Sequence, residues 1–183
     1  MSESGFFAAP WDQKLTALTL LFSAITLGAT GLLVWIGLTR VPPTAVRAFL
    51  VANALVPLGV FAAAALMAPR GYQVGTDGLR VRRPVLPVTI PAASIRQVER
   101  IAPDLVAGAL RTLGTGGFFG YYGRFRSRGL GDFRMYATRS DGYVLVRADR
   151  LYVLTPESPD AFVDALDRAR QSAAGGRAEP PAR

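Results

Sequence analysis

The chain has 183 residues, half of them apolar, and carries 21 basic against 13 acidic side chains, for a formal net charge of +8. It contains no cysteine and no histidine. These absences exclude a disulfide framework, cysteine nucleophiles, histidine-based triads and zinc fingers. Only 19% of the residues are charged, which is low for a soluble domain of this length.

The apolar residues concentrate near the N-terminus, in two runs without charge at residues 15–38 and 48–68. At about 1.5 Å per residue, each run is long enough to cross a hydrocarbon core roughly 30 Å thick. Trp11 and Trp35 lie close to the two ends of the first run, and indole rings favour the headgroup level. Helices in soluble cores seldom exceed 20 residues without a polar face. The pattern therefore predicts two transmembrane helices.

The segment between these runs, residues 39–47, is short and contains Pro42 and Pro43, which suit a tight connection. Two helices joined in this way form an antiparallel hairpin with both chain ends on one side. Residues 1–14 then form an N-terminal tail. The first run is too long for a cleaved signal peptide, and Glu3 and Asp12 precede it.

Positive charge near the two spans predicts their orientation in the membrane. Arg40 and Arg47 lie in the link, whereas more basic residues lie close to the spans on the side of the termini. This bias favours cytoplasmic termini and an inner-membrane location, although the pattern leaves an extracytoplasmic domain open. Within the second span, Asn53 is expected either to bond across to Thr26 or Thr30 or to stay partly satisfied.

Beyond Pro69 the sequence becomes polar and alternating, and basic residues outnumber acidic ones by 18 to 11. Alternation of apolar and polar residues, bounded by turn dipeptides such as Asp77-Gly78, is typical of antiparallel strands. Strands are predicted at residues 72–74, 79–82, 88–90, 95–101, 133–138, 143–147 and 151–154.

One amphipathic helix follows the strands. Ser158 suits the N-cap, Pro159 the first helical position, and Phe162 and Leu166 fall on one face. Residues 172–183 are expected to be a disordered tail. Strands followed by one helix within about 100 residues predict a curved antiparallel sheet or barrel, closed at one end by the helix. The predicted domain spans residues 70–171 and is of the pleckstrin-homology (PH) type.

Three stretches resemble bacterial PH-like domain proteins that are anchored by N-terminal helices. They are YQVGTDGLRV at 72–81, GGFFGYYGRF at 116–125 and YVLTPE at 152–157. The resemblance covers residues 70–168 and implies a PH-like barrel in the cytoplasm, but no particular activity. Eukaryotic PH domains often bind phosphoinositides. The first hairpin here lacks a matching cluster of basic residues, so that ligand is not implied.

The most unusual segment is the glycine-rich stretch at residues 114–129. It lacks the Gly-Lys-Ser/Thr of a phosphate-binding loop and the third glycine of a dinucleotide fingerprint. Aromatic side chains favour the headgroup level, and arginine pairs with phosphate. Three interpretations stay open: contact with anionic lipid headgroups, contact with a protein partner, or a purely structural loop with solvated arginines. The candidate contact residues are Phe118, Phe119, Tyr121, Tyr122, Arg124, Arg126 and Arg128.

The acidic residues form neither a catalytic carboxylate pair nor a metal-ligand pattern, and the two spans contain no ionisable side chain. The sequence therefore predicts no catalytic residue, cofactor or metal, and the membrane anchor disfavours nucleic acid as a partner. The predicted function is a membrane-anchored, non-catalytic binding or scaffolding protein. The alternative is an accessory or regulatory subunit of a larger membrane complex, through a membrane protein partner or a homo-oligomer.

Overall fold

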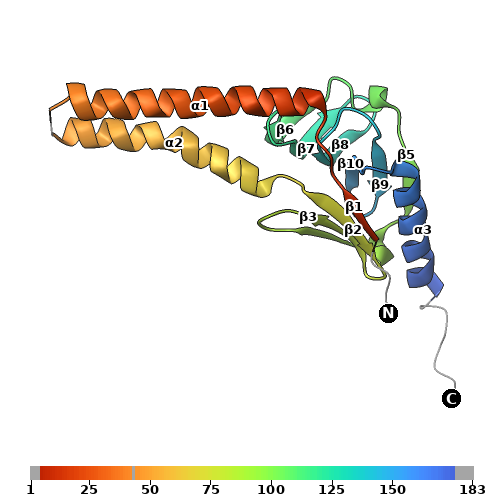
Figure 1. Cartoon of the computed structure of the whole chain (residues 1–183). Coiled ribbons are helices and arrows are strands. Elements are labelled where there is room, and N and C mark those ends of the chain that lie inside the picture. Colours follow the sequence, from red (N-terminus) through yellow and green to blue (C-terminus); the bar gives the residue numbers. More distant parts are fainter. Residues whose placement is uncertain (1–4, 43, 176–183) are drawn as a thin grey trace, which may run out of the picture.

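The computed structural model of the chain describes residues 5–42 and 44–175 (Figure 1). Two long helices, α1 (Gln13–Arg40) and α2 (Ala45–Met67), lie side by side and run antiparallel. Both are long and apolar enough to cross a membrane, and only 11% of the most apolar window of each is buried. Such low burial distinguishes them from core helices of a soluble bundle. The predicted pair of helices is confirmed. Pro43 of the predicted link lies outside the described residues.

One polar contact joins the two helices. The Thr30 hydroxyl donates a hydrogen bond to the Ala54 carbonyl at 3.2 Å. The Asn53 amide donates instead to the Phe49 carbonyl of its own helix, at 2.9 Å. Of the two alternatives expected for Asn53, the bond across to α1 is not made, and the side chain is partly satisfied within its own helix because the carbonyl one turn back is within reach.

The segment before α1, expected to be a tail, contains a strand. β1 (Gly5–Ala8) pairs antiparallel with β2 (Gly71–Gly75), and the sheet continues through β3 (Gly78–Arg82) and β4 (Val88–Pro91). The order of this first sheet is β1-β2-β3-β4. The N-terminal residues thus add an edge strand to the first sheet of the C-terminal domain, although α1 and α2 separate β1 from β2 in the sequence.

A second sheet has the order β5-β9-β10-β8-β7-β6. The β10–β8 pairing is parallel and the others are antiparallel, so the predicted all-antiparallel arrangement has one exception. The two sheets are curved and do not close into a barrel. The strands of the second sheet are β5 (Gln97–Arg100), β6 (Leu110–Gly116), β7 (Tyr121–Ser127), β8 (Gly131–Ala137), β9 (Val144–Arg147) and β10 (Leu151–Leu154).

Helix α3 (Pro159–Gly175) follows the strands, as predicted, and packs Phe162 and Leu166 into the core. It includes residues 172–175, which were expected in the tail; residues 176–183 lie outside the described residues. Two short 3₁₀ turns, η1 (Ala92–Ser94) and η2 (Pro103–Leu105), complete the described elements.

The core has two parts, one on each face of the second sheet. The inner face packs toward the first sheet and α3, around the fully buried Tyr72. The Tyr72 hydroxyl donates to the Tyr136 carbonyl at 2.6 Å and accepts from the Thr155 amide at 3.3 Å, and burial raises its pKa to about 12. The outer face carries the second cluster, which includes Phe125 and Phe133.

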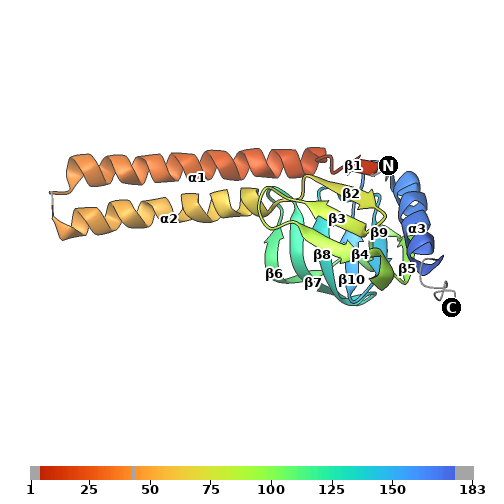
Figure 2. The same ribbon diagram turned by 90° about the horizontal axis from the view of Figure 1, so that it is seen from below.

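The helix pair adjoins one end of the domain. In Figure 2, β6 and the loop between β3 and β4 lie at this end, whereas α3 lies at the opposite end. The Val85 amide of that loop donates to the Leu66 carbonyl of α2 at 3.1 Å. If the helices cross a bilayer, this end of the domain is the one nearest to the lipid surface.

Candidate functional site

The glycine-rich segment folds into a hairpin, formed by β6 and β7 and the turn at residues 117–120. Gly114 and Gly123 are directly paired across it, with φ of +119° and +128°. A Cβ at Gly114 would collide with the Tyr122 carbonyl oxygen, and one at Gly123 with that of Leu113. The sequence did not predict these two strands, because glycine is rare in strand interiors. Here glycine is what permits the close backbone approach.

The turn of this hairpin packs against the base of the two long helices. Phe118 lies 5.4 Å from Phe22 of α1 and 5.7 Å from Phe61 of α2, measured between ring centroids. Phe119 lies 4.7 Å from Phe61 and 6.1 Å from Trp11. We call these five rings, Trp11, Phe22, Phe61, Phe118 and Phe119, the aromatic clamp.

Two further hydrogen bonds fasten the hairpin to the helices. The Phe119 amide donates to the Thr19 hydroxyl at 3.0 Å, and the buried Tyr122 hydroxyl donates to the Ala64 carbonyl. Phe119 has φ of +59°, an uncommon conformation for a bulky residue. The ring contacts and the hydrogen bond offset the strain of this backbone conformation.

Tyr121 and Tyr122, the next two candidate residues, lie at the start of β7. Tyr121 is half-buried against the outer core cluster, whereas Tyr122 belongs to the inner one. Burial raises the pKa of both hydroxyls. Both rings therefore contribute to packing at the helix end of the domain.

The start of α1 is joined to the domain through Asp12. Its carboxylate caps the helix by accepting from the Leu15 amide at 2.6 Å. The same carboxylate accepts from the Ser140 hydroxyl at 2.6 Å and the Ser140 amide at 3.0 Å. Partial burial raises the pKa of Asp12, but these hydrogen bonds, with the charge of Lys14, outweigh it and hold the pKa below its usual value.

The three candidate arginines lie farther along the hairpin, away from the aromatic clamp. Arg124 and Arg126 belong to the inner face of β7, and exposed Arg128 follows the strand. Arg126 pairs with Asp132 at 3.4 Å on the exposed surface. The structure therefore separates the candidate set into an aromatic end that packs on the helices and a basic end on the sheet.

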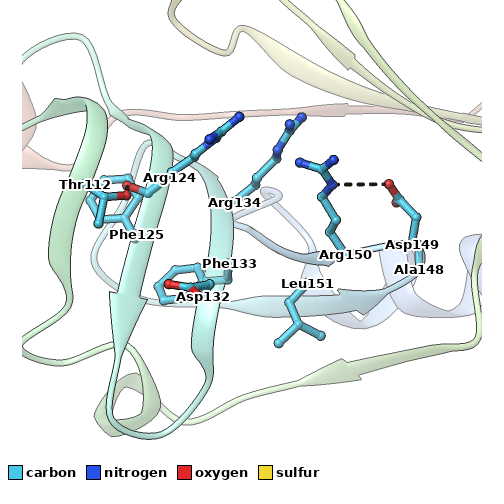
Figure 3. Close-up of a pocket in the computed structure, with 10 residues that line it drawn as sticks. All are labelled: Thr112, Arg124, Phe125, Asp132, Phe133, Arg134, Ala148, Asp149, Arg150 and Leu151. Carbon is cyan, nitrogen blue, oxygen red and sulfur yellow. Dashed lines mark hydrogen bonds and ion pairs between the residues drawn. The ribbon is translucent and has the colours of Figure 1, made fainter.

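Arg124 lines a pocket of about 600 Å³ together with two arginines that the sequence analysis did not select, Arg134 and Arg150. Figure 3 shows these three side chains projecting from one side of the sheet, with Phe125 and Phe133 on the other. Alternation within the predicted strand at residues 133–138 places Arg134 and Phe133 on opposite faces of the sheet. Only the pairing of β7, β8 and β10 reveals that the arginines converge.

The pocket also contains two aspartates, Asp132 and Asp149. Asp149 lies 3.6 Å from Arg150 and accepts a hydrogen bond from the Tyr152 hydroxyl at 3.1 Å. Among residues 5–42 and 44–175, no group of three or more His, Cys, Asp or Glu side chains is placed to hold a metal ion. The pocket offers guanidinium groups for binding an anion.

Comparison with known proteins identifies a family for the second half of the chain. Residues 70–170, more than half of the chain, match a family model described as a bacterial PH domain. No curated protein matches the chain. No solved structure matches it either.

Proposed function

Because the chain belongs to the bacterial PH domain family, we propose that it is a membrane-anchored, non-catalytic binding or scaffolding protein. PH domains are generally binding modules rather than enzymes. In this proposal, α1 and α2 cross the inner membrane and the PH-like domain, with both termini, lies in the cytoplasm. The aromatic clamp is the observation that carries the proposal.

The clamp supports a fixed orientation of the domain at the membrane. Rings from the N-terminal segment, both helices and the β6–β7 turn pack together, and β1 adds a second connection to β2. A domain on a flexible tether would need neither the ring packing nor the β1–β2 pairing. With the domain held in this way, the same surface always faces the lipid.

Exposed apolar side chains at the helix end of the domain support contact with lipid. Leu110 and Leu113 of β6 are 74% and 64% exposed, and Leu86 of the β3–β4 loop is 63% exposed. Figure 2 places both elements beside the helices. Apolar side chains at this depth gain free energy by entering the headgroup region, and nearby arginines add attraction to anionic lipid.

Depth measurements in a bilayer test this placement. The chain contains no cysteine, so Leu86→Cys, Leu113→Cys and Ser172→Cys each give a single site for a spin label. The full chain is reconstituted in nanodiscs, because β1 completes the first sheet and a fragment beginning at Arg70 would lack it. Collisional relaxation by nickel-chelating lipid headgroups then reports proximity to the surface.

We expect strong relaxation at positions 86 and 113 and little at position 172, on exposed α3 at the opposite end of the domain. Equal relaxation at the three sites would contradict a fixed orientation. Weak relaxation at positions 86 and 113 would contradict contact with the lipid surface.

The orientation across the membrane is tested with the same strategy. Thr44→Cys in the link between the helices and Ser172→Cys in α3 are labelled in intact cells with a membrane-impermeant maleimide. We expect labelling at position 44 from outside and at position 172 only after permeabilisation. The reverse pattern would place the domain outside the cytoplasm.

A second candidate role is that of an accessory or regulatory subunit of a membrane complex or a homo-oligomer. Gly28 and Gly31 lie on an exposed face of α1, and no atom lies within 4 Å of a Cβ placed at either position. Small residues allow close helix contact in membranes. Disulfide crosslinking of Gly28→Cys in native membranes, with Leu20→Cys as the matched site, tests this role. Equal crosslinking at both positions would contradict it.

A further inference from the structure

The pocket on the inner face of the second sheet collects arginines from three separate segments. Arg124 comes from β7, Arg134 from β8, and Arg150 from the turn between β9 and β10. Figure 3 shows their guanidinium groups on the same side of the sheet. This site is distinct from the β2–β3 hairpin and from the aromatic clamp.

The pairing of Arg124 with Arg134 is unfavourable in the unliganded protein. The two residues are directly opposite each other on neighbouring strands, where like charges destabilise a sheet. In residues 5–42 and 44–175, neither guanidinium has a salt-bridge partner within 4.0 Å. An anion between them would remove this repulsion.

The aspartates nearby do not neutralise the pocket. Asp132 pairs with Arg126, and Asp149 pairs with Arg150. With these pairs counted, Arg124 and Arg134 remain as excess positive charge. Arginine is also the side chain that binds phosphate oxygens in a bidentate geometry.

A fourth arginine lies along the same face. Arg83 of the β3–β4 loop lies over the ring of Tyr136, at 5.5 Å, and Tyr136 is two residues along β8 from Arg134. The Nε atom of Arg83 is buried and has no hydrogen-bond partner within the described part of the chain. Another nitrogen of this guanidinium donates to the Leu86 carbonyl, and Arg83 does not line the pocket itself, so its contribution is additional positive charge on this face of the sheet.

Exposed apolar side chains border the arginines. A register shift between Arg111 and Leu113 pairs Leu110 with Arg126 and Leu113 with Arg124. Both leucines therefore lie on the arginine side of the sheet at its β6 edge. The site combines cationic groups with an apolar border, which suits a phosphate attached to an apolar group.

We propose that this arginine pocket, formed by Arg124, Arg134 and Arg150, binds a phosphate group, either of a soluble phosphate compound or of a lipid headgroup. The proposal deepens the proposed binding function, because it names the class of ligand. It does not require the domain to touch the bilayer, since the pocket is defined within the second sheet alone.

Ligand-induced thermal stabilisation of the full chain in neutral detergent tests the proposal. Three probes are titrated separately: inorganic pyrophosphate, dioctanoyl phosphatidate and, as the zwitterionic comparison, dioctanoyl phosphatidylcholine. The variants are Arg124→Gln and Arg134→Gln. The matched control is Arg80→Gln, an exposed arginine of β3 outside the pocket.

We expect at least one of the two anionic probes to raise the melting temperature of the wild type and of Arg80→Gln in a saturable way. Each pocket variant should weaken binding about tenfold or more, because a hydrogen bond to a charged group is lost. Stabilisation by pyrophosphate alone assigns the site to a soluble phosphate. Tighter binding of phosphatidate assigns it to a lipid headgroup, with Leu110 and Leu113 contacting the acyl chains.

Three results would overturn the proposal: no stabilisation by either anion, equal stabilisation by phosphatidylcholine, or equal weakening in Arg80→Gln. The far-ultraviolet circular dichroism of each variant shows whether it is folded. If the pocket binds no phosphate, the spin-label depth measurements are unaffected. The proposal of phosphate binding and the proposal of a fixed orientation at the membrane can therefore be contradicted independently.

Discussion

The two ends of the β6–β7 hairpin use the same short stretch of sequence in opposite ways. At the turn, Phe118 and Phe119 are half-buried against α1 and α2 and join the domain to the helices. Along β7, Arg124 is exposed and directly opposite Arg134, a pairing that costs stability. Side chains that stabilise a fold and side chains that cost stability are thus adjacent. The second kind is the better indicator of a binding site.

The largest loss of stability is expected from a substitution in the paired strands of the hairpin, on which both ends depend. Gly123→Ala places a Cβ against the Leu113 carbonyl oxygen at φ of +128°, so strand pairing must distort. We expect a loss of about 3 kcal/mol or more in the free energy of unfolding. Chemical denaturation measures it. Gly75→Ala, where no atom lies within 4 Å of the added Cβ, is the control and should lose less than about 1 kcal/mol.

The aromatic end is tested by Phe119→Ala, which removes the ring and keeps the Cβ at the same φ. We expect a loss of about 2 kcal/mol, because contacts with Phe61 and Trp11 disappear. Amide exchange should also increase in β1 and the β6–β7 turn. Phe6→Ala, at a ring that is 61% exposed, should change little. A similar loss in both variants would mean that the clamp has no special role.

The junction at Asp12 gives a pH-dependent effect. Asp12→Asn keeps a capping oxygen but removes the negative charge that favours the helix N-terminus and strengthens the bonds from Ser140, so we expect a loss of about 1 kcal/mol at pH 7. The pKa of Asp12 is lowered in the fold, so its contribution is present above the unfolded value near 3.8 and disappears as the pH falls through the folded pKa. Thermal unfolding from pH 7 to pH 3 should show the difference between wild type and variant shrinking. A constant difference would contradict the role of the ionised carboxylate.

The smallest change in the free energy of unfolding is expected at the basic end, where a substitution should increase stability rather than decrease it. Arg134→Gln removes the repulsion with Arg124, so we expect the ligand-free protein to gain a few tenths of a kcal/mol. Thermal unfolding in phosphate-free buffer is the measurement. A loss of 1 kcal/mol or more would show that Arg134 has a structural role, as the aromatic residues do.

The sequence predicted the elements whose signals are local. Uncharged runs identified both long helices, alternation identified most strands, and Ser158-Pro159 identified the start of α3. The pairing of β1 with β2 could not be predicted, since four residues before α1 carry no periodic signal and their partner lies beyond two helices. β6 and β7 were missed because five glycines between residues 114 and 123 resemble a loop.

The sequence indicated only one of the three arginines that line the pocket. Arg124 was selected from its neighbours in sequence, whereas Arg134 and Arg150 belong to segments that looked like ordinary strand and turn. Their convergence depends on strand order, and the parallel β10–β8 pairing that brings them together has no local sequence signal. The aromatic residues were selected as a group for contact with lipid or a partner, whereas their contacts with α1 and α2 depend on tertiary packing and have no sequence signal.

The most direct test of the division between the two ends is hydrogen–deuterium exchange of the full chain in neutral nanodiscs, with and without dioctanoyl phosphatidate or pyrophosphate. We predict that the β6–β7 turn is protected without ligand. Added phosphate should protect the region around Arg124 in β7, Arg134 in β8 and the β9–β10 turn. Rapid exchange at the turn in the ligand-free protein, or no added protection around the arginines with either anion, would contradict the account.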